Sequence, residues 1–426
     1  IEYVRRRAAS PGGDRQAMHA PTKTLYFVLA AVVLAAAAVL VDPSKSTPDI
    51  FDDVGEQFFA DFTDPQAPRS IEVIDYDETT ATATPLKVEF TGNRWVVPSH
   101  HGYPADAGER LATTAAALIE LRKDRVVSDL AQDHAEYAVV DPLDEQATSL
   151  AGRGKRVKIL DGDANVLADL IVGKQVTDKS GYRYMRVPGQ KRTYEVKTDA
   201  DVSARFQDWI ETDLLKVSPF DLRRIEINSY TINERLGRIE NRQQTTLTQK
   251  DGKWQLAGRE PDSETMGDLT KALDNLRIVD VQPKPAGLSA DLKAREGIQP
   301  TMENFQSLQG KGFFPNPYTG QILSNEGEIL VDSKDGLRYT LRFGEVARGG
   351  AGAGSGEDAA SAESEGERRY LMVSVSFDEG RAEGYAGDAE QGKELAGELR
   401  ARFADWYYVI SGADFASLRP RRADLR

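Results

Sequence analysis

The chain has 426 residues, a formal net charge of −14 at pH 7, 40% hydrophobic residues and 29% charged residues. This length exceeds what one hydrophobic core usually serves, so we expect two domains. The composition excludes a polytopic membrane protein, a collagen and a wholly disordered chain. Because the chain has no cysteine, a disulfide scaffold, thiolate metal ligation and a catalytic thiol are excluded as well.

Charge is distributed unevenly along the chain. Residues 1–23 carry a net charge of +3, so the remaining residues carry −17. Because nucleic acids attract basic surfaces, the acidic body argues against a nucleic-acid partner.

A run of 18 residues without a charge, 24–41, follows the basic arm 1–23. As a helix it spans about 27 Å, close to the thickness of the hydrocarbon layer of a bilayer. Basic residues before the run and acidic residues after it place the arm in the cytoplasm and the body outside. The sequence therefore predicts a single-pass transmembrane helix. A cleaved signal peptide, with small residues at 35–38, is the main alternative, and a buried soluble helix is another.

Residues 42–69 contain four prolines and six aspartates. This composition predicts a stalk or linker that extends the reach of the body, with one short helix around 54–59.

From residue 70 onward the sequence repeats itself, and such repeats are interpreted before local motifs. Each copy opens with a short alternating strand, at 71–74 and at 224–227. Each continues into a hairpin-like pair that ends at Trp95 or Trp254. The dipeptide Asp251-Gly252 is a strong signal for a two-residue hairpin turn.

An amphipathic helix follows each hairpin. In the first copy Asp106 and Glu109 form a capping box, and in the second copy Asp262 or Ser263 caps the helix. The residues expected to face the core are Leu111, Ala115, Leu118 and Ile119 in the first copy, and Met266, Leu269, Leu273 and Leu276 in the second.

The later halves of the two copies also match. Residues 157–174 correspond to 328–345 as two short strands around a turn, closed by Gly173 in one copy and by Gly344 in the other. Each copy then ends on an aromatic signature that contains a tryptophan.

The four tryptophans mark matching places in the repeat, Trp95 with Trp254 and Trp209 with Trp406. Equivalent positions favour a structural role in the core. Contact with a partner or a glycan is the alternative, because aromatic rings also supply interface surface.

The matched order predicts the α+β fold class, with an N-terminal transmembrane helix followed by two tandem homologous β-rich domains at 70–222 and 223–420. The second copy is longer, and we assign its extra residues to insertions at 301–325, 348–368 and 379–400. We expect the middle insertion to be disordered, because it has too little apolar surface to offset its ordering entropy.

The first insertion concentrates aromatic residues in a segment that the first copy folds without. An exposed aromatic loop is a docking element, so we assign a partner-binding role to Phe313, Phe314 and Tyr318. Packing of these rings onto the second copy is the alternative.

Few residues carry a pattern typical of chemistry. His100 and His101 with His134 are candidates for a metal site, but adjacent side chains in an extended segment point to opposite faces, so a solvated loop is the alternative. Residues 152–156 lack the spacing of a phosphate-binding loop, and Ser355 lies in a low-complexity run rather than in a nucleophile elbow. We therefore expect no catalytic residue, no cofactor and no metal.

Six segments of the body carry a resemblance to a known family. They are RWVVP at 94–98, ALIELRKDRVVSD at 117–129, DLIVGK at 169–174, YRYMRV at 182–187, YEV at 194–196 and DWIETDLL at 208–215. On these segments the chain resembles the domain of unknown function family 4340 (DUF4340). Its members are bacterial, often anchored at the N-terminus and built from tandem copies of such a unit.

The resemblance implies a place in the bacterial inner (cytoplasmic) membrane, with the body in the periplasm. It also implies an accessory role, because the family often lies beside ATPase, permease and gliding-motility-like components of ABC export systems. ABC-type permeases and auxiliary membrane proteins are the partners it implies. It offers no active-site residues to carry over.

We expect a non-catalytic, membrane-anchored accessory or scaffold protein of an ABC-type transport or cell-envelope complex. One alternative is a solute- or glycan-binding protein that uses the cleft between the domains, and another is a divergent hydrolase. A binding protein requires a pocket at the domain junction with converging polar groups, whereas an enzyme requires close titratable groups with shifted pKa values. A scaffold requires neither.

Overall fold

The computed structural model describes residues 53–147, 149–198, 200, 202–233, 238–250, 252–285, 301–316, 321–348 and 367–426. Residues 54–426 form one compact unit. The expected cytoplasmic arm, the expected transmembrane helix and most of the expected insertion at 348–368 lie outside the described residues. Within the described part of the chain, no helix is both long enough and apolar enough to cross a membrane.

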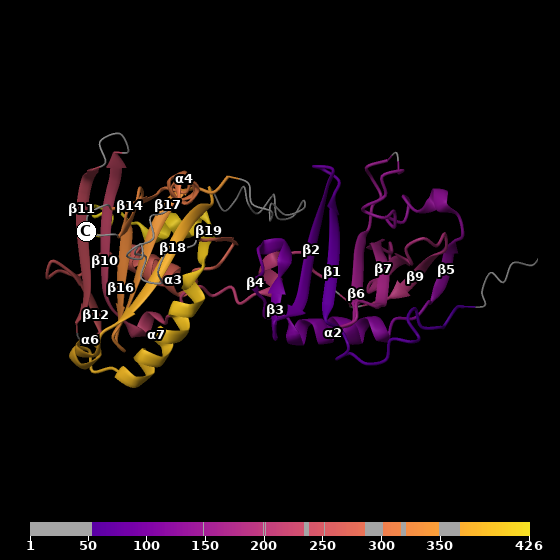
Figure 1. Ribbon diagram of the computed structural model, residues 1–426, viewed down its shortest axis with the longest axis horizontal. Helices are drawn as coiled ribbons and strands as arrows, with labels where there is room; N and C mark the ends of the chain where they lie inside the picture. Colours follow the sequence, from indigo (N-terminus) through magenta and orange to yellow (C-terminus); the bar gives the residue numbers. More distant parts are fainter. Residues whose placement is uncertain are drawn as a thin grey trace, which may run out of the picture. The chain divides into compact units, whose positions relative to one another are not determined.

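The first sheet has nine strands in the order β4-β3-β2-β1-β6-β7-β8-β9-β5, and each neighbouring pair is antiparallel (Figure 1). The strands are β1 (Ser70–Asp77), β2 (Thr82–Thr91), β3 (Arg94–Val97), β4 (Tyr103–Pro104), β5 (Arg125–Ser128), β6 (Lys155–Leu160), β7 (Val166–Gln175), β8 (Tyr182–Arg186) and β9 (Thr193–Lys197).

The second sheet has eight antiparallel strands in the order β12-β11-β10-β16-β17-β18-β19-β13, and a separate small sheet joins β14 and β15. The strands are β10 (Leu222–Asn233), β11 (Arg238–Lys250), β12 (Lys253–Leu256), β13 (Asp280–Pro283), β14 (Phe313–Pro315), β15 (Ile322–Ser324), β16 (Glu328–Ser333), β17 (Leu337–Val346), β18 (Arg369–Phe377) and β19 (Trp406–Ile410).

The described helices accompany these sheets and confirm the α+β class. They are α2 (Gly108–Ile119), α3 (Ser263–Asp274), α4 (Met302–Gly310), α6 (Glu379–Gly384), α7 (Ala389–Ala404) and α8 (Gly412–Leu418), with the 3-10 turns η2 (Pro98–His100), η3 (Ala131–Asp133), η4 (Phe206–Trp209) and η5 (Pro219–Asp221).

The two sheets share one strand order. Without β4, the first sheet is β3-β2-β1-β6-β7-β8-β9-β5, and the second runs through β12-β11-β10-β16-β17-β18-β19-β13 in the same sequence of chain positions. In both, a helix follows the third strand, and the next strand of the chain joins the far edge of the sheet. Two stretches of chain therefore follow the same path.

Matching pairs of apolar residues set the register of both sheets. Ile71 on β1 lies opposite Val88 and Ile159, and all three side chains are buried. On β10, Ile225 lies opposite Leu247 and Val331, which are also buried. Because successive strand residues point to opposite faces, these pairs define the face of each sheet that meets the core.

The helices after the third strands begin differently. In α3, Asp262 caps the N-terminus, because its Oδ1 accepts the N–H of Thr265 at 2.8 Å. The expected capping box of Asp106 and Glu109 is wrong, since α2 begins at Gly108 after Ala107 and has no side-chain cap. The N–H of Asp106 instead donates to the carbonyl of Trp209 at 2.8 Å, which holds Asp106 outside the helix.

Residues 54–69 do not form the expected stalk with a short helix. Gln57 makes an isolated bridge with Arg122, the N–H of Phe58 donates to the carbonyl of Leu121, and Phe62 is buried in the core. The apolar side chains of this segment therefore pack onto the first sheet.

The segment before the second sheet, residues 206–221, makes the same contacts, and we call it the linker. Asp213 bridges with Arg277, and the N–H of Leu214 donates to the carbonyl of Leu276 at 2.9 Å. Residues 211–214 thus stand to the second sheet as residues 55–58 stand to the first. Each stretch of chain begins its packing before its first strand, ahead of the boundaries 70 and 223 expected from sequence.

A glycine marks the same crossing point in each sheet. At Gly173 on β7, an added Cβ would overlap the carbonyl oxygen of Tyr137 and lie 2.7 Å from Val139. At Gly344 on β17, it would overlap the carbonyl oxygen of Lys311 and lie 2.8 Å from Phe313. The N–H groups of the residues after these glycines donate to the same two carbonyls. In each sheet, therefore, a neighbouring segment of chain passes so close to the strand that only a residue without a Cβ fits there.

The expected insertions are only partly specific to the second sheet. The segment 311–313, inside the expected insertion 301–325, has its counterpart in 137–139 of the first sheet. The expected insertion at 379–400 forms α6 and most of α7, and α7 packs along β18 (Figure 1). Between β8 and β9 of the first sheet the chain has only residues 187–192.

Candidate binding site

A cavity of about 450 Å³ lies where the first sheet, the linker and the second sheet meet. We call it the junction pocket. It is lined by Arg94, Tyr103, Pro104, Ala105, Asp106, Glu211, Lys216, Ala401, Arg402, Asp405 and Trp406.

The first wall of the junction pocket comes from the edge of the first sheet. Arg94 opens β3 and Tyr103 opens β4. The N–H of Ala105 donates to the carbonyl of Trp95 at 2.9 Å. This bond holds the turn after β4 against β3, so Asp106 at the start of the next segment is fixed beside the cavity.

The linker forms the second wall. Glu211 accepts the N–H of Asp213 at 3.1 Å and pairs with Lys216 at 3.2 Å. Partial burial acts to raise the pKa of the Glu211 carboxyl, but the Asp213 N–H and Lys216 hold it below its ordinary value. Lys216 has a left-handed backbone, with φ of 51°, and its N–H donates to Asp213 at 2.9 Å. The linker is thus a fixed turn at this point.

The third wall comes from the end of α7 and the start of β19. Nη2 of Arg402 donates to the carbonyls of Glu211 and Asp213, at 3.1 and 2.6 Å, and so ties α7 to the linker. Trp406 meets Tyr103 of the first sheet edge to face, with ring centroids 5.0 Å apart. The junction pocket therefore has an aromatic contact between the sheets as part of its lining.

A buried amine lies behind this wall. The N–H of Lys284 donates to the carbonyl of Asp405 at 2.7 Å, and its Nζ donates to the carbonyl of Phe403 at 2.7 Å. Burial lowers the pKa of the Lys284 amine to about 7, an effect that the Asp405 carboxylate opposes. Lys284 thus supports the C-terminal end of α7, whose unpaired carbonyls attract a cation.

A second titratable pair joins the sheets away from the cavity. Nε2 of His100 lies 3.9 Å from Oδ1 of Asp280, and both side chains are buried. The His100 ring stacks on Phe206 with centroids 4.0 Å apart. Burial, with a contribution from His101, lowers the pKa of His100 to about 4, and burial raises the pKa of Asp280.

Neither His100 nor Asp280 lines the junction pocket. His101 is exposed, and Nε2 of His134 lies 2.7 Å from the carbonyl of Lys191. Among the described residues, no group of three or more histidine and carboxylate side chains is arranged to hold a metal ion. The histidines considered from sequence are therefore not brought together.

Only one of the two expected tryptophan pairs occupies equivalent positions in the two sheets. Trp95 lies on β3 and Trp254 on β12, which are matching strands, and both are half-buried. Trp209 lies in η4, before the second sheet, and is fully buried with its Nε1 donating to Ser203 at 3.0 Å. Trp406 instead opens β19 inside the second sheet. The pairing of Trp209 with Trp406 is wrong, because η4 belongs to the linker that precedes β10.

The three residues expected to dock a partner differ in their exposure. Phe313 is fully buried and stacks on Tyr407, with ring centroids 5.5 Å apart. A docking role needs an exposed ring, so the structure places Phe313 in the core instead, the alternative considered from sequence. Phe314 is half-buried on β14, and Tyr318 lies outside the described residues. A partner-binding role for these two residues stays a prediction.

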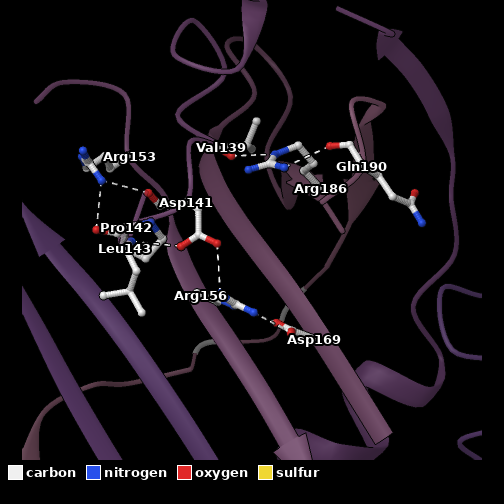
Figure 2. A network of polar contacts seen from close by, with 9 residues as sticks. All are labelled: Val139, Asp141, Pro142, Leu143, Arg153, Arg156, Asp169, Arg186 and Gln190. Carbon is white, nitrogen blue, oxygen red and sulfur yellow. Dashed lines mark hydrogen bonds and ion pairs between the residues drawn. The ribbon is translucent and has the colours of Figure 1, made fainter. Parts of the chain in front are cut away.

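A polar network braces one loop of the first sheet (Figure 2). We call residues 139–144 the braced loop. Arg153 donates to three of its carbonyls, those of Asp141 and Pro142 at 3.0 Å and that of Asp144 at 2.8 Å. Arg186 donates to its first carbonyl at 2.8 Å, and Arg156 pairs with the Asp141 side chain at 3.0 Å. Arg153 and Arg186 thus satisfy backbone carbonyls that would otherwise need water.

The junction pocket escaped sequence reasoning because its walls come from segments far apart in the chain. Of its lining residues, the sequence points only to Asp106, as a helix cap, and to Trp406, as a structural residue. The one usable signal was the charge-rich segment DWIETDLL at 208–215, which joins the two repeats and carries Glu211.

The comparisons with known proteins give one match. Residues 95–291 match the family model described as "Domain of unknown function (DUF4340)". No curated protein and no solved structure matches the chain. The matched stretch runs from β3 of the first sheet to beyond β13 of the second, so it includes the linker wall of the junction pocket. The match supports the family expected from sequence over residues 95–291, a little under half of the chain.

Proposed function

We propose that this chain is a non-catalytic, membrane-anchored accessory protein that binds a small solute or a segment of a partner in the junction pocket. The body lies on the outer side of a bacterial inner membrane, in an ABC-type transport or cell-envelope complex. The uncharged run at 24–41 and the DUF4340 resemblance support this location and role. The common strand order and the matched crossing glycines support an origin by tandem duplication.

The observation that carries binding is the composition of the junction pocket. Its walls come from both sheets and from the linker, and they bring charged groups of both signs beside aromatic rings. Polar groups that converge in a cavity are typical of ligand sites, whereas a scaffold needs none. This favours the binding alternative over a scaffold alone. The hydrolase alternative lacks such support, since the His100–Asp280 pair is buried away from the pocket.

Site-specific photocrosslinking in native membranes tests this function. Ala401 is exposed and lines the junction pocket, so a photoreactive residue there reports what enters the cavity. Met302 on α4 is 73% exposed and serves as the matched control. We expect an adduct from position 401 that is absent from position 302. Equal adducts at both positions, or none at 401, would contradict binding in the junction pocket.

A second candidate is a scaffold that docks through the braced loop. Leu143 lies in this loop and is 52% exposed, although the surrounding backbone is fixed by arginines. A rigid loop that presents an apolar side chain is a favourable contact for a partner, because binding then costs little ordering entropy.

Recovery of co-purifying membrane proteins tests the scaffold candidate. Leu143→Ser should reduce their recovery severalfold, while Leu130→Ser, at a residue with 54% exposure outside the braced loop, should leave it unchanged. Equal recovery with both variants would contradict docking through the braced loop.

A further inference from the structure

The charged groups of the junction pocket divide into paired and unpaired ones. Lys216 pairs with Glu211, and Arg402 donates to linker carbonyls. In the part of the chain that the structure describes, the side chains of Arg94, Asp106 and Asp405 make no hydrogen bond or ion pair. Two carboxylates and one guanidinium are therefore available to a ligand.

These three groups come from two opposite sides of the chain's repeat, the first sheet and the second. Arg94 and Asp106 belong to the edge of the first sheet, and Asp405 follows α7 of the second. Trp406, next to Asp405, is half-buried and lines the same cavity. Indole is the side chain that attracts cations most strongly, and a carboxylate beside it adds a charge-assisted hydrogen bond.

We infer that the junction pocket binds a zwitterionic ligand of the amino-acid or short-peptide class, an inference that rests on the proposed binding function. A cationic group of the ligand lies beside Trp406, between the carboxylates of Asp106 and Asp405. A ligand carboxylate pairs with Arg94, whose planar guanidinium suits it. A cavity of about 450 Å³ has room for more than one amino-acid residue.

A neutral saccharide fits the same groups less well. The C–H face of its ring packs on an aromatic side chain and its hydroxyls hydrogen-bond, but it brings no charge to the three ionised side chains. A zwitterion pairs with all three and compensates their charges, whereas a hydroxyl donates a hydrogen bond to a carboxylate but leaves its charge uncompensated. The charge pattern therefore favours a ligand that carries both signs.

Calorimetric titration of the full chain in detergent micelles tests the ligand class. The probes are L-lysine, the dipeptide alanyl-lysine, its C-terminal amide and maltose. We expect alanyl-lysine to bind more tightly than L-lysine if the source is a peptide, and the reverse if it is a free amino acid; either result supports the class. Affinity should fall as salt rises, because the pocket is open to solvent.

Substitutions assign the roles within the pocket. Asp405→Asn and Asp106→Asn should each weaken alanyl-lysine binding at least 10-fold, whereas Asp268→Asn, at an exposed carboxylate on α3, should change nothing. Arg94→Gln should weaken binding of the free dipeptide but not of its amide, since the amide lacks the carboxylate.

Two results would overturn the inference. One is tight binding of maltose that Trp406→Ala abolishes and the two aspartate variants leave intact. The other is a folded wild-type chain that binds none of the zwitterions. The crosslink from position 401 distinguishes failure of this inference from failure of the proposed function. A specific adduct at position 401 would still show that the junction pocket binds something, even if the ligand is not a zwitterion.

Discussion

The two sheets follow one path and differ in what joins their last strands. In the first sheet, six residues connect β8 to β9, whereas in the second sheet α6 and α7 lie between β18 and β19. α7 packs along β18 and ends at the junction pocket, where it supplies Ala401 and Arg402. The helix α7 therefore forms one wall of the junction pocket, and the first sheet has no corresponding helix. The candidate site lies where the two sheets differ.

The crossing segments show a second difference. Val139 crosses the first sheet, while Phe313 crosses the second and stacks on Tyr407. Phe313 belongs to a small second core with Leu308, Ile322, Tyr370, Met372, Tyr407 and Val409. The second sheet is therefore buried on both faces near β18 and β19, which fixes the strand that carries Trp406.

The largest expected effect is at this second core. Phe313→Ala should lower the free energy of unfolding by about 3–5 kcal/mol, because it removes a fully buried ring and leaves a cavity. Denaturant titration measures the change. Phe314→Ala, at a half-buried ring on the same strand, should cost clearly less. An equal, small effect of both would mean that Phe313 does not support the second sheet.

The contact between the sheets should respond to acid. The pKa of His100 is lowered to about 4 in the folded chain, so between pH 6.5 and 4 the unfolded chain binds the proton more readily and stability falls on acidification. The loss amounts to about 3 kcal/mol, since one pKa unit corresponds to about 1.4 kcal/mol. Asp280 acts in the opposite direction, because its raised pKa favours the folded state at low pH.

Unfolding curves at a series of pH values separate these two contributions. His100→Asn should flatten the decline in stability between pH 6.5 and 4, and Asp280→Asn should steepen it. A wild-type profile that stays level over this range, with His100→Asn parallel to it, would show that the buried pair does not titrate as argued.

The sequence predicts the repeated part of the fold well and the asymmetric part poorly. Alternating strands, hairpin turns and the helix after the third strand are local patterns, and each appears where expected. The crossing segments 137–139 and 311–313 are not similar in sequence. Only Gly173 and Gly344 indicate their presence, and a glycine in a strand can have several structural causes. Interpreted as strand ends, these two glycines do not indicate that residues 311–313 have a counterpart in the first sheet.

The junction pocket was beyond sequence for a different reason. Its charges belong to segments about 100 and 200 residues apart, and only tertiary packing brings Arg94, Glu211 and Asp405 together. The aromatic signatures around Trp209 and Trp406 are alike in sequence but not in structure, because one lies in the linker, before Glu211, and the other leads into β19. The sequence suggests a binding cleft between the domains as an alternative, but it does not identify the residues that line it.

The crossing glycines give a matched test of the shared path. Gly173→Ala and Gly344→Ala should each lower the free energy of unfolding by about 1–3 kcal/mol, because the new Cβ overlaps a backbone carbonyl that cannot easily move. Gly267→Ala on α3 is the control: its Cβ meets nothing within 4 Å, so helix propensity should raise stability by about 0.5–1 kcal/mol. A cost at only one crossing would break the equivalence of the two sheets.

The smallest expected effect distinguishes the two helices that follow the third strands. Asp262→Ala should lower the free energy of unfolding by about 1 kcal/mol, because it removes the oxygen that accepts the Thr265 N–H at the start of α3. Asp106→Ala should leave stability within about 0.5 kcal/mol of wild type, since its side chain caps nothing in α2 and exposed substitutions of this kind are usually near neutral. Denaturant midpoints of the two variants, measured side by side, decide the matter. If Asp106→Ala costs as much as Asp262→Ala, α2 has the cap expected from sequence, and the two helices start alike after all.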